Sequence, residues 1–278
     1  MNFELDDLRM HYCVEGEGTP ILMLHGRPTD HRAMMGAFEP IFQDRPGWQR
    51  IYVDMPGMGD TTGGSWIDSN EAVVNVLIQF MDEMVGERPY LIAGFSYGGH
   101  IARGILYKRT AQVSGLMLFA PAIGAGEDRI LASPRIFGKD TDQFSQYPQP
   151  LVEQFAPLVV AHDEAVINRL GEILGGLQKA DQTMLRQIGQ NYKFAFPIDE
   201  LPAPYDLPVL IVAGKHDAVT GYEQAGDLAK SYPRATYAVL DRAGHAVHLE
   251  QPALFNLLVH EWLDRVEESI QATEEKER

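Results

Sequence analysis

Short apolar runs alternate with amphipathic stretches along most of the chain. Seven runs carry apolar residues at most positions and end at glycine, proline or charged residues. They cover residues 10–15, 20–24, 50–54, 90–94, 113–119, 208–213 and 236–240. Runs this short, with little polar alternation, are typical of strands that are buried on both faces of a sheet.

Between these runs lie four stretches with helical periodicity. They cover residues 70–85, 97–108, 222–231 and 252–267. In the first of them we expect Asn70 to be the N-cap, with Val73, Leu77 and Met81 on one apolar stripe. Strands that alternate with helices predict an α/β fold with a mostly parallel sheet covered on both faces.

The alternation stops between residues 123 and 206, where helical spacing and scattered prolines replace the buried runs. A separate C-terminal domain is one explanation, but the strand–helix alternation resumes at Pro208. We therefore expect one core domain, residues 1–122 and 207–278, interrupted by a mainly helical cap at 123–206. A length of 278 residues fits a single α/β domain with an insertion.

Charge and composition narrow the possible partners. The chain has 39 acidic and 23 basic residues, a net charge of −16, which disfavours binding to nucleic acids and anionic membranes. No apolar run approaches the roughly 18 residues of a membrane span, and the first ten residues do not resemble a secretory signal. We expect a cytoplasmic protein that acts on a small molecule; its oligomeric state stays open.

The single cysteine, Cys13, excludes an internal disulfide and any zinc site with two thiolates. It lies in a predicted strand, where we interpret it as a small buried apolar residue. The sequence implies no metal and no organic cofactor.

The strongest chemical signal is the segment 94–99, GFSYGG, between a predicted strand and a predicted helix. A sharp strand-to-helix turn holds a serine in a strained conformation and exposes its hydroxyl group. The N-terminus of the following helix favours developing negative charge. The pattern therefore predicts that Ser96 is a nucleophile.

On this motif the chain resembles the α/β-hydrolase superfamily, specifically its serine-nucleophile branch with a helical cap. The resemblance covers residues from about 10 to 123 and from 206 to 267. It implies that the segment 25–28, HGRP, forms an oxyanion hole in which the backbone N–H groups of Arg27 and Tyr97 hold the oxyanion. The segment 54–60 also resembles a family loop, which we interpret as architecture rather than chemistry.

The resemblance also implies the partners of the serine, which needs a base to become nucleophilic. His245 follows the last predicted strand, as the family's catalytic histidine does, and Asp217 follows the strand 208–213 at the family's acid position. The order Ser96, Asp217, His245 is the one that this fold uses. The family's other acid position, at residues 119–122, holds no carboxylate.

Other histidines are weaker candidates. His248 is the nearest rival base, but we expect it to begin a helix or to pack behind the loop. We expect His100 to pack inside its helix and His25 to support the oxyanion loop.

Substrate contacts are harder to predict. Arg27 is charged beside the expected oxyanion hole and could pair with a substrate carboxylate, or instead with Asp30, an acid of the cap, or solvent. Phe95 is a second candidate for substrate binding. Cap aromatics could line an apolar cleft or form plain core: Phe137, Phe144, Phe155, Tyr192, Phe194 and Phe196.

The expected activity is hydrolysis of a small ester or related acyl substrate through an acyl-enzyme. A carbon–carbon bond hydrolase, an amidase or iminopeptidase, a perhydrolase and an acyltransferase remain open, because fold alone does not separate them. Dehalogenases and epoxide hydrolases need a carboxylate where Ser96 stands. A ligand-binding, receptor-like protein is the alternative from another class.

Overall fold

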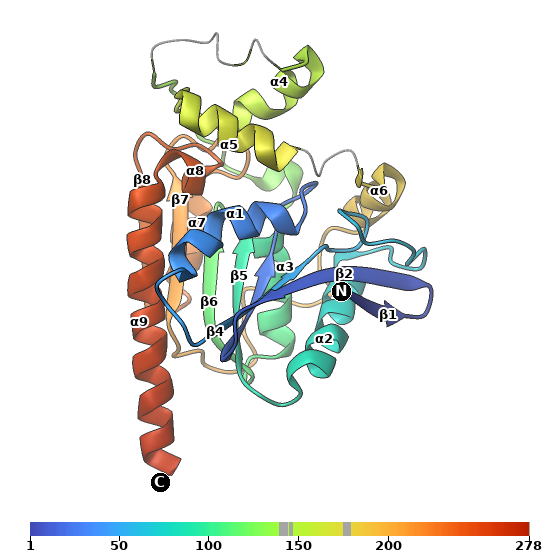
Figure 1. Cartoon of the computed structure of the whole chain (residues 1–278), viewed down its shortest axis with the longest axis vertical. Helices are drawn as coiled ribbons and strands as arrows, with labels where there is room; N and C mark the ends of the chain where they lie inside the picture. The colour runs from blue at the N-terminus through green and yellow to red at the C-terminus, as the bar shows by residue number, and fades with distance from the viewer. Residues whose placement is uncertain (139–143, 145–146, 175–178, 278) are drawn as a thin grey trace.

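The computed structural model describes residues 1–138, 144, 147–174 and 179–277. Eight strands form one sheet in the order β1-β2-β4-β3-β5-β6-β7-β8 (Figure 1). Strands β3 to β8 run parallel, whereas β1 and β2 pair antiparallel at one edge. Their bounds are β1 Asn2–Leu5, β2 Leu8–Glu15, β3 Thr19–Leu24, β4 Trp48–Val53, β5 Tyr90–Phe95, β6 Val113–Phe119, β7 Val209–Gly214 and β8 Ala235–Leu240.

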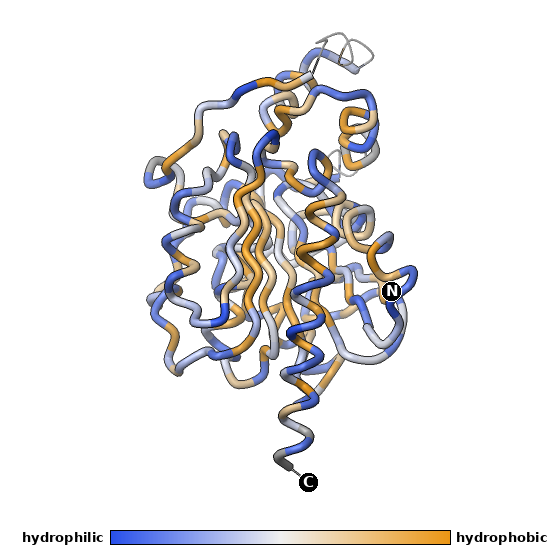
Figure 2. The backbone as a smooth tube through the Cα atoms, turned by 90° about the vertical axis from the view of Figure 1, so that its left-hand side faces the viewer, coloured by the Kyte–Doolittle hydropathy of each residue, from blue (hydrophilic) through white to orange (hydrophobic). Residues whose placement is uncertain are grey.

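Helices cover both faces of this sheet and enclose two apolar clusters. Helices α1 (His31–Phe42) and α9 (Pro252–Glu277) pack on one face. Helices α2 (Asn70–Val85), α3 (Tyr97–Lys108) and α7 (Glu223–Ala229) pack on the other. Figure 2 shows the apolar strands side by side at the centre of the molecule, as expected for a sheet buried on both faces.

Between β6 and β7 the regular elements of the described chain are helices and helical turns. It forms the 3-10 turn η1 (Gly126–Asp128), helix α4 (Gln149–Phe155), the 3-10 turn η3 (Ala156–Leu158), and helices α5 (Glu164–Leu174) and α6 (Gln182–Gln190). Helices α4 and α5 lie above one end of the sheet (Figure 1). A third apolar cluster joins this segment to the short helix α8 (Val247–Glu250). Ala246, which precedes α8, and Leu249, which lies within it, both belong to this cluster.

The predicted strands and helices agree closely with the structure, with four differences. The N-cap of α2 is Ser69, whose side chain accepts from the Ala72 amide; Asn70 is instead buried, and its side chain bonds Tyr97 and Tyr192. The sequence analysis missed the short edge strand β1, only one of whose residues is buried, and helix α1, which contains Pro40. Helix α9 extends ten residues beyond the predicted end at 267, to Glu277.

None of the described helices has both the length and the apolar character that crossing a membrane requires.

Candidate active site

Ser96 occupies the turn between β5 and α3 with a backbone φ of 53° and ψ of −114°. This left-handed region is unfavourable for a residue with a side chain, so the surroundings must hold it there. The Ser96 amide donates to the Phe119 carbonyl at 3.1 Å, and the Ser96 carbonyl accepts from the Ala122 amide at 3.0 Å. A Cβ at Gly98 would lie 2.2 Å from the Leu24 carbonyl oxygen, so only glycine lets β3 and the turn approach this closely.

Three side chains meet in one hydrogen-bonded chain at the carboxyl end of the sheet. His245 Nε2 lies 3.0 Å from Ser96 Oγ, and His245 Nδ1 lies 2.9 Å from Asp217 Oδ2. With Nδ1 protonated and donating to the carboxylate, Nε2 is free to accept the serine proton. The structure thus brings together the three residues that the sequence analysis selected, from loops that are far apart in the chain.

The Asp217 carboxylate is fully buried and held from several sides. Its Oδ1 accepts from the amides of Val219 and Thr220, and its Oδ2 accepts from the Thr220 hydroxyl at 2.7 Å. Burial raises the pKa of Asp217, but the neighbouring His245 and the hydrogen bonds from His245 and Thr220 outweigh it and lower the pKa. The carboxylate therefore stays ionised and can stabilise a protonated His245.

Thr220 is a contributor that the sequence analysis missed. Its hydroxyl group also lies 3.4 Å from His245 Nδ1. The spacing Asp217-x-x-Thr220 after a buried strand was a usable signal, because an aspartate commonly accepts hydrogen bonds from residues two and three positions on.

The loop that follows β3 lies against the serine. His25 Nδ1 lies 2.8 Å from the Gly26 carbonyl, and its Nε2 accepts from the Met55 amide at 3.0 Å, so the ring joins this loop to the end of β4. Burial lowers the pKa of His25, which keeps the ring neutral. Tyr97 begins α3, and a first-turn amide has no acceptor within its own helix.

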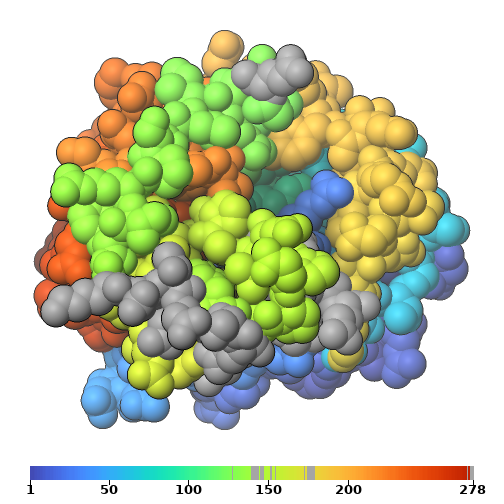
Figure 3. Space-filling model, turned by 90° about the horizontal axis from the view of Figure 1, so that it is seen from above, coloured from blue at the N-terminus to red at the C-terminus, as the bar shows by residue number. Residues whose placement is uncertain are grey.

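A cavity of about 330 Å³ opens beside Ser96, lined in part by Arg27, Tyr97, Arg129 and Tyr192. Seen from above, the surface is hollowed between the green–yellow and gold segments, and blue and teal core atoms form the floor (Figure 3).

Two guanidinium groups line this cavity and have no counter-ion among the described side chains. Arg27 Nη2 donates to the Leu185 carbonyl of α6 at 2.8 Å, and Arg129 Nη2 donates to the Tyr192 hydroxyl at 3.1 Å. In the described parts of the chain neither forms an ion pair, and the buried Nε of Arg129 has no acceptor. Asp30, considered as a partner for Arg27, pairs instead with Arg32. Arg129 was not among the site residues predicted from the sequence.

A sequence model of the α/β hydrolase family matches residues 21–256. The chain belongs to the α/β hydrolase family. Its fold, with a mostly parallel eight-stranded sheet between helices, confirms the predicted fold class.

Named relatives of this α/β hydrolase include a pimeloyl-[acyl-carrier protein] methyl ester esterase of Legionella pneumophila (strain Paris). It is 24% identical and covers 92% of this chain and 100% of its own length. A pyrrolizixenacetamide deacetylase of Xenorhabdus hominickii is 22% identical over 94% of this chain and 96% of its own. The crystal structure of an alpha/beta superfamily hydrolase from Oenococcus oeni PSU-1 is 27% identical, with a TM-score of 0.85, and covers 96% of this chain and 99% of that one.

Two other histidines near the site pack against aromatic side chains. His248 lies in α8, where Phe95, Phe119 and Phe255 surround it, and burial lowers its pKa to about 3. His100 lies in α3 and stacks on Tyr192. Burial lowers the pKa of His100 to about 3 as well. Both rings are therefore neutral near pH 7.

Phe95 stacks on Phe119, with ring centroids 4.9 Å apart, and its ring lies 5.1 Å from that of His245. Phe95 therefore packs against the His245 ring. Its role in binding substrate stays a prediction. Among the cap aromatics, Tyr192 lines the cavity beside Ser96. The others pack against neighbouring rings or apolar side chains: Phe137, Phe144, Phe155, Phe194 and Phe196.

Proposed function

We propose that this α/β hydrolase is a serine esterase that works through a Ser96–His245–Asp217 triad and an acyl-enzyme. The observation that carries the proposal is the chain of hydrogen bonds at 3.0 and 2.9 Å from the strained Ser96 through His245 to the buried Asp217. The named esterase among its relatives supports an ester as the substrate.

In the proposed reaction His245 Nε2 takes the proton of Ser96 Oγ while that oxygen attacks the ester carbonyl carbon. His245 then gives the proton to the leaving alkoxide, and the acyl group remains on Ser96. Water, deprotonated by the same Nε2, hydrolyses the acyl-enzyme and restores the serine. Asp217, held by Thr220, orients the ring and stabilises the imidazolium in both steps.

The backbone N–H groups of Arg27 and Tyr97 are proposed to bind the oxyanion. Tyr97 supports this because it starts α3, where the helix end favours negative charge. Arg27 lines the same cavity as Ser96. Each such donor can lower the barrier by about 2.7–4 kcal/mol.

The two guanidinium groups, which have no counter-ion among the described side chains, support an ester that carries a negative charge away from the scissile bond. A carboxylate can pair with Arg27 or Arg129 in a site already partly screened from water, where such pairs bind strongly. We therefore propose that a monoester of a dicarboxylic acid is hydrolysed better than the corresponding neutral diester.

Labelling with a fluorophosphonate probe tests the nucleophile. Wild type and a Ser65→Ala control, which changes an exposed loop serine, are expected to be labelled, whereas Ser96→Ala is not. Folded wild-type protein that resists the probe and hydrolyses none of a panel of esters would reject the proposal in favour of a binding protein.

Amide hydrolysis is the second candidate, because one relative is named a deacetylase. Matched ester and anilide substrates with the same acyl group distinguish the two. A kcat/KM that is higher on the anilide would make an amidase the better description.

A further inference from the structure

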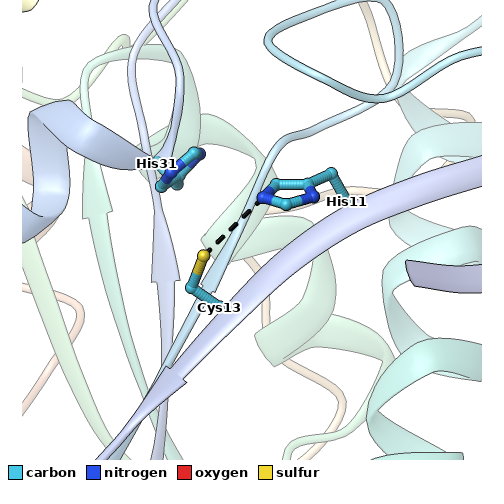
Figure 4. A group of neighbouring side chains, drawn as sticks. All are labelled: His11, Cys13 and His31. Carbon is cyan, nitrogen blue, oxygen red and sulfur yellow. Dashed lines mark hydrogen bonds between the residues drawn. The ribbon is translucent and has the colours of Figure 1, made fainter. Parts of the chain in front are cut away.

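We propose that His11, Cys13 and His31 form a binding site for a zinc-like divalent ion, separate from the catalytic serine. The ligand atoms of these three side chains all lie within 4.8 Å of one another. Figure 4 shows the two imidazoles and the thiol facing one another between β2 and the start of α1. None of the three lines the cavity beside Ser96.

The backbone accounts for this convergence. His11 and Cys13 are two residues apart on β2, so their side chains emerge on the same face of the sheet. This is the face that α1 covers, because Cys13 packs against the apolar cluster that contains Met34 and Phe38. His31 is the first residue of α1, so it lies over this face and close to His11 and Cys13.

The spacing already present suits a tetrahedral ion. His11 Nε2 and Cys13 Sγ lie 3.6 Å apart. Zinc–nitrogen bonds of about 2.0–2.1 Å and zinc–sulfur bonds of about 2.3 Å, at a tetrahedral angle, place N and S about 3.6 Å apart and two nitrogens about 3.3 Å apart. The His31 ligand atom lies within 4.8 Å of the other two, and binding an ion would bring it to about that distance.

His31 is also oriented as a metal-binding histidine usually is. Its backbone amide and its Nδ1 both donate to Asp54 Oδ1, each at 2.8 Å. With Nδ1 occupied by a buried carboxylate, the lone pair available to an ion is the one on Nε2. Such carboxylate–histidine pairs fix the tautomer and make the ring a better ligand.

The donor set selects the class of ion. Two imidazoles and a thiolate suit zinc and similar borderline-soft ions, whereas magnesium and calcium prefer oxygen. Three protein ligands leave a fourth position for water. All three residues keep some exposure to solvent, 12% for the His31 side chain, so an ion can reach them. Cys13, which the sequence analysis treated as a buried apolar residue, would instead supply the thiolate.

Binding releases the proton of the Cys13 thiol, because its sulfur bonds the ion as a thiolate, together with the Nε2 proton of His31 wherever that ring is protonated. The ion would link β2 to the start of α1, just beyond the loop that supports Ser96. Catalysis does not pass through it, so we expect chelator-treated enzyme to keep its hydrolytic activity.

The test is calorimetric titration of chelator-treated, reduced full-length protein with ZnCl₂, together with the absorption spectrum of its Co²⁺ form. We expect one Zn²⁺ per chain, release of at least one proton when buffers of different ionisation enthalpy are compared, and a thiolate-to-cobalt charge-transfer band. MgCl₂ is expected to give no heat of binding.

Cys13→Ala and His11→Gln are expected to lose the cobalt band and to weaken zinc binding by more than the roughly 10–100-fold that follows loss of an outer-shell partner. The control His260→Gln removes a histidine on α9 and should bind as wild type does. Wild type that binds no zinc, or Cys13→Ala that binds it equally well, would overturn the proposal and leave only a thiol–imidazole hydrogen bond. Neither outcome bears on the esterase proposal, which the probe labelling tests.

Discussion

Glu250 joins the loop that carries His245 to the segment between β6 and β7, and its replacement by glutamine gives the sharpest test of how this region is stabilised. The carboxylate is buried and accepts three backbone N–H bonds, from Gly244 at 2.6 Å, Val160 at 2.6 Å and Ala161 at 2.9 Å. Gly244 precedes His245, and the other two residues follow η3.

The Glu250→Gln change removes one acceptor and adds a donor. The amide oxygen can keep the bonds from Val160 and Ala161, but the NH₂ group then faces the Gly244 N–H. One buried N–H left without a partner costs about 1–3 kcal/mol of unfolding free energy. For a protein of this size that lowers Tm by about 2–12 °C.

The direction in which pH changes the stability follows from the pKa of Glu250. Burial, only partly offset by the three N–H groups, raises the pKa of Glu250 to about 7 from a normal value of 4.5. A carboxyl group with a raised pKa stabilises the fold fully below pH 4.5, and that contribution is lost as pH rises through about 7. A pKa difference of that size corresponds to roughly 3 kcal/mol of unfolding free energy. Glutamine does not titrate, so the variant lacks this pH dependence.

The stability gap between wild type and Glu250→Gln is therefore expected to be largest near pH 5 and to shrink or reverse by pH 8. Urea unfolding of both proteins across this range measures it. Glu87→Gln, at an exposed position after α2, is the matched control and should stay within about 0.5 kcal/mol of wild type throughout. A gap that widens with pH would refute the reasoning, because it would mean that the N–H groups stabilise the ionised form more than burial penalises it.

Four further predictions concern the site and the N-cap of α2. Asp217→Asn should keep the fold but lower kcat by about 10⁴-fold, because the amide favours the wrong histidine tautomer; an unchanged kcat on an ester would contradict the triad. Thr220→Val removes one hydrogen bond to Asp217 and should lower kcat far less, with KM unchanged. Arg129→Gln should raise KM for an acidic monoester and leave a neutral diester unaffected; equal effects on both would exclude charge recognition. Ser69→Ala removes the α2 N-cap and should cost about 1 kcal/mol in urea unfolding without changing kcat.

The sequence by itself determined the alternation of elements and singled out three side chains that the structure brings within hydrogen-bond distance of one another. Buried strands and amphipathic helices have local periodicities, so seven of the eight strands, all but the edge strand β1, were predicted near their observed bounds. The turn around Ser96 was also readable, because a nucleophile in a strained strand-to-helix turn requires small neighbours at fixed offsets. The choice of Asp217 and His245 depended on a family resemblance and on chain order.

Only the tertiary structure decided which distant groups meet. Glu250 accepts hydrogen bonds from backbone amides about 90 positions away. Arg27 and Arg129 line one cavity from separate loops. His31 lies close to His11 and Cys13. Such contacts have no local pattern, because they depend on strand order and on how the segment between β6 and β7 packs over the sheet. The N-cap of α2 shows the same limit at short range: Asn70 was an equally suitable residue, but burial against Tyr97 and Tyr192 assigned the cap to Ser69.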